Sequence, residues 1–171
     1  MNKDILYNIL LQLSPEELKS MCMTNNITIL ICNNPHFWKD KLINDDIPMI
    51  SKVMNINDYI YHYQLKNKAV EHIKSSSTFN APASIIPTKI LNKITTYEPK
   101  YQFTIRYLMN RYVINTKGEG AVLSYHELLH FLMLYYQYKD EHPDEFILPK
   151  FDHSSDISFD DSSDISYEDE L

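Results

Sequence analysis

The chain has 171 residues, a length that suits one domain or one small domain with an appendage. Hydrophobic residues make up 44% of it, and no window approaches the roughly 20 apolar residues that cross a bilayer, so we expect a soluble globular protein without a membrane partner. Only two glycines occur, which argues against a turn-rich barrel or sandwich and against a glycine-rich phosphate loop, and favours helices.

The net charge of −7 is unevenly distributed along the chain. Residues 152–171 contain eight acidic residues and no Lys or Arg, so the preceding residues carry 15 acids and 16 bases, a balance of +1. A nucleic-acid binder would show a concentrated basic face. The body of the chain has none, and we expect no nucleic-acid partner.

The first 47 residues are typical of short helices with marked ends. An apolar stripe at helical spacing is followed by Ser14-Pro15-Glu16-Glu17, in which Ser14 and Glu17 can form a capping box. A third helix is expected around residues 27–32, and Asn34-Pro35 starts a fourth. The pair Ile47-Pro48 predicts a boundary, because a residue before proline is disfavoured in a helix. The residues of the first stripe are Ile5, Leu6, Ile9, Leu10 and Leu13.

The remainder also favours helices. We expect a long helix over 57–75, a loop over 80–87, a short helix over 88–95, a turn over 116–120 and a strong helix over 124–139. Residues 101–114 alternate like a strand but also suit a helix, and we predict a helix there. The fold class expected is therefore all-α, with an N-terminal unit over 1–47, a helical C-terminal domain over 48–150 and a tail over 151–171.

The tail contains an acidic repeat. Ser154-Ser155-Asp156-Ile157-Ser158-Phe159-Asp160-Asp161 recurs as Ser162-Ser163-Asp164-Ile165-Ser166-Tyr167-Glu168-Asp169. So acidic a segment cannot bury enough apolar surface to fold alone, and we expect it to be disordered. Ser158 and Ser166 each precede an acid by three residues, as acidophilic kinases favour, so the tail is either a phosphorylation site or a solubilising segment.

The first 47 residues also carry a set of motif positions: Asp4, Ile5, Ile9-Leu10, Leu13, Pro15, Glu17-Leu18 and Pro35-His36-Phe37-Trp38. This set resembles an F-box, whose pattern has a Leu-Pro start, an acid and Leu, an Ile-Leu pair, a Leu, an acid-Leu pair after a proline, and a Pro-x-aromatic/Leu-Trp close. The chain departs from the family at Asn2, which stands where proline is usual, and at Thr24 and Thr28. The abundance of Asn and Ile also looks like that of F-box-like proteins of large DNA viruses.

The resemblance implies a binding function rather than catalysis. F-box helices lay apolar residues on the Skp adaptor of a cullin ubiquitin ligase, and the C-terminal domain would recruit an unknown substrate protein. Trp38 would have a structural role, and some Skp-binding positions would pack against it instead of the adaptor. The chain would act in the cytoplasm or nucleus, of a host cell if it is viral, and would not be secreted. The residues at the Skp-binding positions are Ile5, Ile9, Leu10, Leu13, Pro15 and Leu18.

A competing motif is His126-Glu127-Leu128-Leu129-His130, an HExxH sequence on a predicted helix. His126 and His130 would share one helix face and could bind zinc, with Glu127 as general base, as in a small zinc metallopeptidase. Against this, Ser124 and Glu127 also form a capping box, and no recognisable third ligand follows. We therefore expect no catalytic residue, metal or cofactor, and keep the zinc peptidase as the alternative.

Two further interpretations remain. Cys22 and Cys32 are too few for a disulfide framework, and we expect them to be small buried hydrophobes in a protein made for a reducing compartment. A third function is also open: a non-catalytic interaction protein whose F-box resemblance has no functional meaning.

Overall fold

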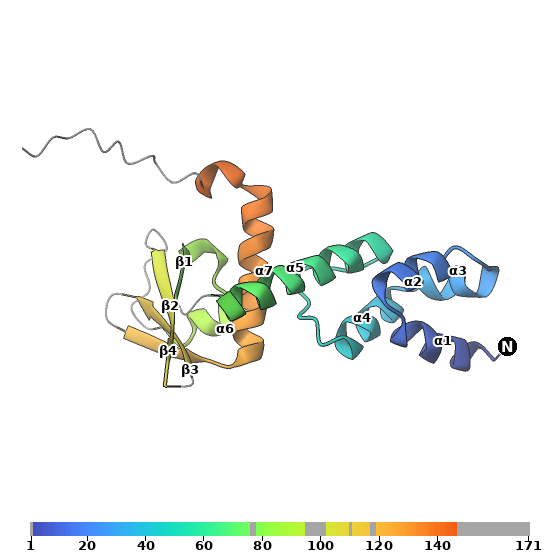
Figure 1. Cartoon of the computed structure of the whole chain (residues 1–171), viewed down its shortest axis with the longest axis horizontal. Coiled ribbons are helices and arrows are strands. Elements are labelled where there is room, and N and C mark those ends of the chain that lie inside the picture. Colours follow the sequence, from blue (N-terminus) through green and yellow to red (C-terminus); the bar gives the residue numbers. More distant parts are fainter. Residues whose placement is uncertain (1, 76–77, 95–101, 110, 117–118, 147–171) are drawn as a thin grey trace, which may run out of the picture.

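The structure is a computed structural model that describes residues 2–75, 78–94, 102–109, 111–116 and 119–146. Figure 1 shows the short helices of the N-terminal region at one end of the molecule and a small sheet with a covering helix at the other. A long helix runs between these two units. The expectation of a disordered tail falls outside the described residues.

The four short helices form the helical unit. Their starts follow local capping: Ser14 and Glu17 make the predicted capping box, and Asn34 accepts a hydrogen bond from the backbone N–H of His36 ahead of the fourth helix. Leu10 and Leu18 are completely buried between these helices. The helices are α1 (Lys3–Gln12), α2 (Pro15–Met21), α3 (Asn26–Cys32) and α4 (Pro35–Asn44).

The end of α4 explains the boundary predicted at Ile47-Pro48. Asp46 has φ 53°, in the left-handed region that usually takes glycine. The backbone N–H of Ile47 reaches back to the carbonyl of Leu42 at 2.8 Å, and that of Asp46 to Ile43 at 3.1 Å. This pair of bonds is a Schellman motif, which satisfies the last carbonyls of the helix and turns the chain away.

Helix α5 (Ile56–Ser75) joins the two units. It contacts α2 and α4 through its first half and the last long helix of the chain through the rest. Tyr59, Leu65 and Ala69 are fully buried. Leu65 and Ala69, four residues apart, lie on one side of the helix, whereas Tyr59 lies on another side, against Trp38 of α4. A single 20-residue helix therefore connects the hydrophobic cores of both units.

The C-terminal unit corrects the expected all-α fold class. It contains a four-stranded antiparallel sheet in the order β1-β2-β3-β4, so the fold is mixed α and β. Each strand pairs with the next along the chain, a meander that needs no crossover. The strands are β1 (Thr78–Pro82), β2 (Gln102–Leu108), β3 (Arg111–Thr116) and β4 (Glu119–Leu123).

The prediction of a helix over 101–114 was wrong, because it followed the helical spacing of this segment and not its strand-like alternation. The alternating residues Phe103 and Ile105 are buried on the inner face of the sheet, and Ile114 pairs with Ile105 on that same face. Scarcity of glycine did not prevent the turn: β2 and β3 are joined by two residues, and Met109 has φ 49°. The turn thus uses the left-handed region without a glycine.

Two other segments also differ in the structure from the elements expected for them. Part of the loop expected over 80–87 belongs to β1, followed by a short 3-10 turn (Ala83–Ile85), and part of the turn expected over 116–120 belongs to β4. The short helix after the loop is present as α6 (Thr88–Leu91).

Helix α7 (Tyr125–Glu141) covers the inner face of the sheet, and its prediction over 124–139 is confirmed. Phe131 is fully buried, with its ring centroid 5.7 Å from that of Phe79 on β1 and 5.1 Å from that of Phe103 on β2. A second 3-10 turn (Pro143–Phe146) ends the described chain. The core of this unit is therefore an aromatic layer between α7 and the sheet.

The two cysteines correct a further expectation. They are buried, as predicted, but they form a disulfide between Cys22, at the end of α2, and Cys32, the last residue of α3. Their Cα atoms are 5.8 Å apart, a distance within the usual range for such a bond. The bond joins residues ten positions apart and ties the end of α2 to the end of α3.

Candidate functional site

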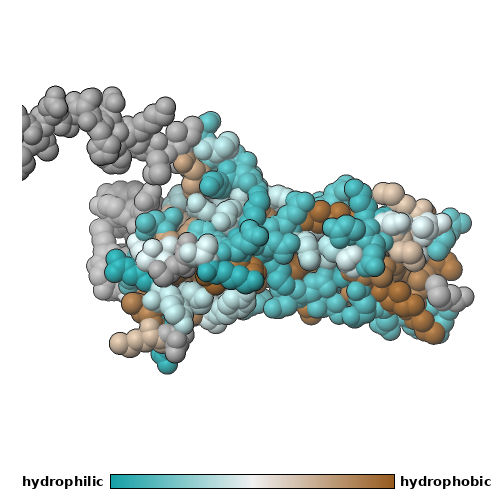
Figure 2. All heavy atoms as spheres, viewed as in Figure 1, coloured by the Kyte–Doolittle hydropathy of each residue, from teal (hydrophilic) through white to brown (hydrophobic). Residues whose placement is uncertain are grey.

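The strongest candidate for a binding site is an exposed apolar surface on α1 and α3. Ile5 and Ile9 lie one turn apart on α1 and are 55% and 42% exposed, and Ile27 and Leu30 on α3 are 43% and 68% exposed. The two helices contact each other, and Figure 2 shows hydrophobic residues gathered at this end of the molecule. We call these four residues the α1–α3 surface. Exposed apolar side chains gathered at one end of a molecule are typical of an interaction site.

The structure divides into two sets the six residues that the F-box resemblance assigns to Skp binding. Ile5 and Ile9 face solvent, whereas Leu10, Pro15 and Leu18 are buried inside the helical unit and Leu13 is half-buried. Periodicity alone places all of them on helix faces, but only the packing of α1 against its neighbours decides which face is inside. Ile27 and Leu30 were missed, although their i, i+3 spacing and lack of charge were visible in the sequence.

Trp38 organises the core beneath this surface. It is fully buried, its indole N–H donates to the carbonyl of Cys32 at 2.7 Å, and its ring packs edge-on against Phe37 and tilted against Tyr59. The hydrogen bond joins α4 to the end of α3. Trp38 thereby helps to fix where α3 presents its exposed residues.

A buried lysine, which the sequence analysis did not single out, ties α1 to α4. The ammonium of Lys41 donates to the carbonyls of Leu11 and Leu13 at 2.8 Å each and forms an ion pair with Asp45 at 2.8 Å. The Tyr59 hydroxyl donates to the same carboxylate, and burial together with that carboxylate raises the pKa of Tyr59. The i, i+4 spacing of Lys41 and Asp45 is visible in the sequence, but such pairs usually lie on the surface.

The HExxH segment is on α7, as predicted, but its glutamate is engaged elsewhere. Glu127 accepts hydrogen bonds from the backbone N–H and hydroxyl of Ser124 at 2.9 and 3.0 Å, and pairs with Lys93 at 3.0 Å. These contacts, the backbone bond first, lower the pKa of Glu127 to about 2. A general base that acts near neutral pH needs a pKa much closer to 7.

The two histidines of the motif have different surroundings. His130 is half-buried, and this burial lowers its pKa, with a smaller effect from Lys89. His126 is exposed, and its Nδ1 lies 3.7 Å from an Oδ1 atom of Asp46 at the end of the helical unit. Within the part of the chain that the structure describes, no three His, Cys, Asp or Glu side chains are grouped as metal ligands.

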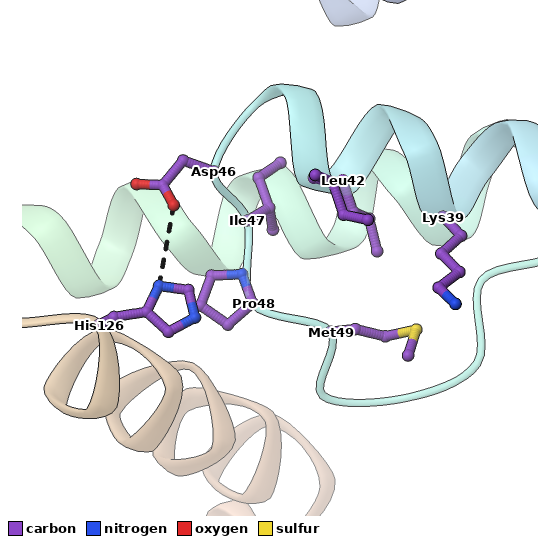
Figure 3. Close-up of a pocket in the computed structure, with 8 residues that line it drawn as sticks. Lys39, Leu42, Asp46, Ile47, Pro48, Met49 and His126 are labelled. Atoms are coloured by element: carbon purple, nitrogen blue, oxygen red, sulfur yellow. Dashed lines mark ion pairs between the residues drawn. The ribbon is translucent and has the colours of Figure 1, made fainter.

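His126 and Asp46 instead line a groove between the two units, shown in Figure 3. The groove has a volume of about 270 Å³ and mostly apolar walls. Its other residues come from α4 and the segment after it, so α7 contributes only His126. The lining residues are Lys39, Leu42, Ile43, Asp46, Ile47, Pro48, Met49 and His126.

Comparison of the chain with family models, with curated proteins and with solved structures finds no match. Among the described residues, no helix combines the length and the hydrophobicity that crossing a bilayer requires. We therefore base the proposed function on the residues and the geometry of the chain itself.

Proposed function

We propose that this chain is an F-box-type adaptor that docks onto a Skp adaptor of a cullin ubiquitin ligase through the α1–α3 surface. The C-terminal unit would recruit the substrate protein. The observation that carries the proposal is the exposure of Ile5 and Ile9 within the segment whose residues match the F-box pattern. Two apolar side chains one turn apart on a short, capped helix suit a helix-in-groove interface.

The energetics support a role in binding. Burying one isoleucine side chain contributes about 1.5–3 kcal/mol, so leaving four large apolar residues in water sacrifices stability that a partner could recover. The helices that present them are held by the hydrogen bond of Trp38 and the contacts of Lys41. A surface held in place in this way loses little conformational entropy on binding.

The test is co-expression of the full chain with a eukaryotic Skp adaptor, followed by size-exclusion chromatography and titration calorimetry. The wild-type chain should elute as a complex, and the double variant Ile5→Asp/Ile9→Asp should bind at least about 100-fold more weakly, because each substitution places a charge in an apolar contact.

A matched control is Ile43→Asp, which changes an equally apolar, 68% exposed residue of α4 outside the α1–α3 surface. Its affinity should stay near that of the wild type. Separate elution of a folded wild-type chain, or equal loss of affinity in the control, would contradict the proposal and leave an interaction protein of another kind.

A further inference from the structure

The outer face of the sheet, opposite α7, carries two arginines and, among its described residues, no acidic one. The strand register aligns Arg106, Val113 and Val122 in one row across β2, β3 and β4, and Leu108 with Arg111 in the next. We call these five residues the sheet outer face. The other described residues of the outward rows are uncharged: Thr78, Asn80, Pro82, Thr104, Asn115 and Gly120.

Both arginines of this face are available to a ligand. Arg106 and Arg111 are exposed, and neither forms an ion pair with any residue that the structure describes. Between and beside them, Leu108 and Val122 are each 49% exposed, and Met109 in the adjoining turn is 96% exposed. Two guanidinium groups around an apolar strip fit a ligand that combines carboxylates with apolar side chains.

The chain itself contains such a ligand. In the repeat 154–169 the apolar residues stand two apart, as Ile157 with Phe159 and Ile165 with Tyr167, with acids on both sides and no Lys or Arg. In an extended segment, residues two apart point to the same side. Each copy can therefore present an apolar pair to Leu108, Val113 and Val122 and carboxylates to the two arginines.

The distance along the chain permits this contact. The described chain ends with the 3-10 turn Pro143–Phe146 after α7, and Figure 1 shows this end of the chain on the side of the molecule that holds the sheet, away from α1 and α3. The seven residues between Phe146 and Ser154 give a connection of up to about 27 Å when extended. Helix α7, at about 1.5 Å per residue, is about 26 Å long. The connection can therefore span the length of α7 and bring the first repeat to the end of the sheet where Val122 lies, shortly before that helix begins.

We propose that the acidic repeat 154–169 binds in cis to the sheet outer face, with its carboxylates on Arg106 and Arg111. The contact is independent of docking on a Skp adaptor, because the two surfaces lie at opposite ends of the molecule. It makes the sheet outer face a binding site for acidic, partly aromatic peptide segments, with the tail as its resident occupant.

The test uses the full chain with the photo-cross-linking residue p-benzoylphenylalanine in place of Phe159. At about 1 µM protein, the effective concentration of the tethered tail near its own sheet is far higher than the concentration of a second copy of the chain. Irradiation should therefore give cross-links within one chain. Peptide mapping should place most of them on residues 107–113 and on Val122. The double variant Arg106→Glu/Arg111→Glu should lower their yield about tenfold.

Two controls make the result specific. Lys52→Glu/Lys74→Glu changes the net charge equally at exposed sites outside the face, and should leave the yield unchanged. Replacing Asp156, Asp160 and Asp161 with lysine in the Arg106→Glu/Arg111→Glu background should restore it. Cross-links that fall mainly on the α1–α3 surface or the groove, that join two chains, or that persist after charge reversal would overturn the proposal.

Discussion

The two units of this protein are stabilised by different means. The helical unit depends on specific polar and covalent ties: the Lys41 ammonium on the carbonyls of Leu11 and Leu13, the indole of Trp38 on Cys32, and the disulfide. The C-terminal unit depends on an aromatic layer between α7 and the sheet. Short helices bury little area each and need directional contacts to fix their angles, whereas a sheet under a helix buries a continuous apolar face.

The largest expected effect tests the aromatic layer. Phe131→Ala should lower the free energy of unfolding by about 3–5 kcal/mol, because it opens a cavity between Phe79 and Phe103 that the β-sheet cannot fill. Urea denaturation followed by far-UV circular dichroism would measure the loss. Tyr125→Ala, at an exposed position of the same helix, should change stability by less than about 0.5 kcal/mol. A small effect of Phe131→Ala would show that the layer does not dominate the C-terminal unit.

A smaller effect tests the polar tie of the helical unit. Lys41→Met keeps the apolar stem but removes the ammonium, which takes one donor from the carbonyls of Leu11 and Leu13 and the positive partner from the Asp45 carboxylate. The free energy of unfolding should fall by about 2–3 kcal/mol. The same measurement on Lys39→Met, an exposed lysine of the same helix, should show almost no change. Equal stability of both variants would mean that the ammonium contributes nothing net.

The smallest effect concerns the start of α7. Glu127→Gln should cost about 1 kcal/mol near pH 7, because it weakens the capping box and the pairing with Lys93. The pKa of Glu127 is lower in the folded protein than its ordinary value of 4.5, so its carboxylate stabilises the fold above that pH. The contribution is lost as the pH falls from 4.5 toward about 2.

Unfolding measured across this pH range should therefore show a smaller acid dependence in Glu127→Gln than in the wild type. Glu71→Gln, which alters an exposed carboxylate on α5, should retain the wild-type dependence. An unchanged profile in Glu127→Gln would assign the acid sensitivity to other carboxylates.

The starts of several helices in both units could be predicted from the sequence because their signals are local. The capping boxes at Ser14 and Ser124 join residues three apart, and both helices begin where those residues stand. The HExxH motif illustrates the limit of such a signal. Glu127 fits both a capping box and a catalytic motif. Only the folded structure shows that Lys93 pairs with Glu127 and that Asp46 lies beside His126, because both partners are distant in sequence.

The sequence by itself determined where most helices start and which residues are apolar enough for a core. It did not determine the sheet, since strand pairing joins residues as distant as Thr78 and Arg106, and a short apolar run fits either period until a partner strand is present. Nor did it decide that Ile5 and Ile9 face solvent while Leu10 and Leu18 are buried. Exposure depends on which helix covers which face, and that is a property of the assembled tertiary structure.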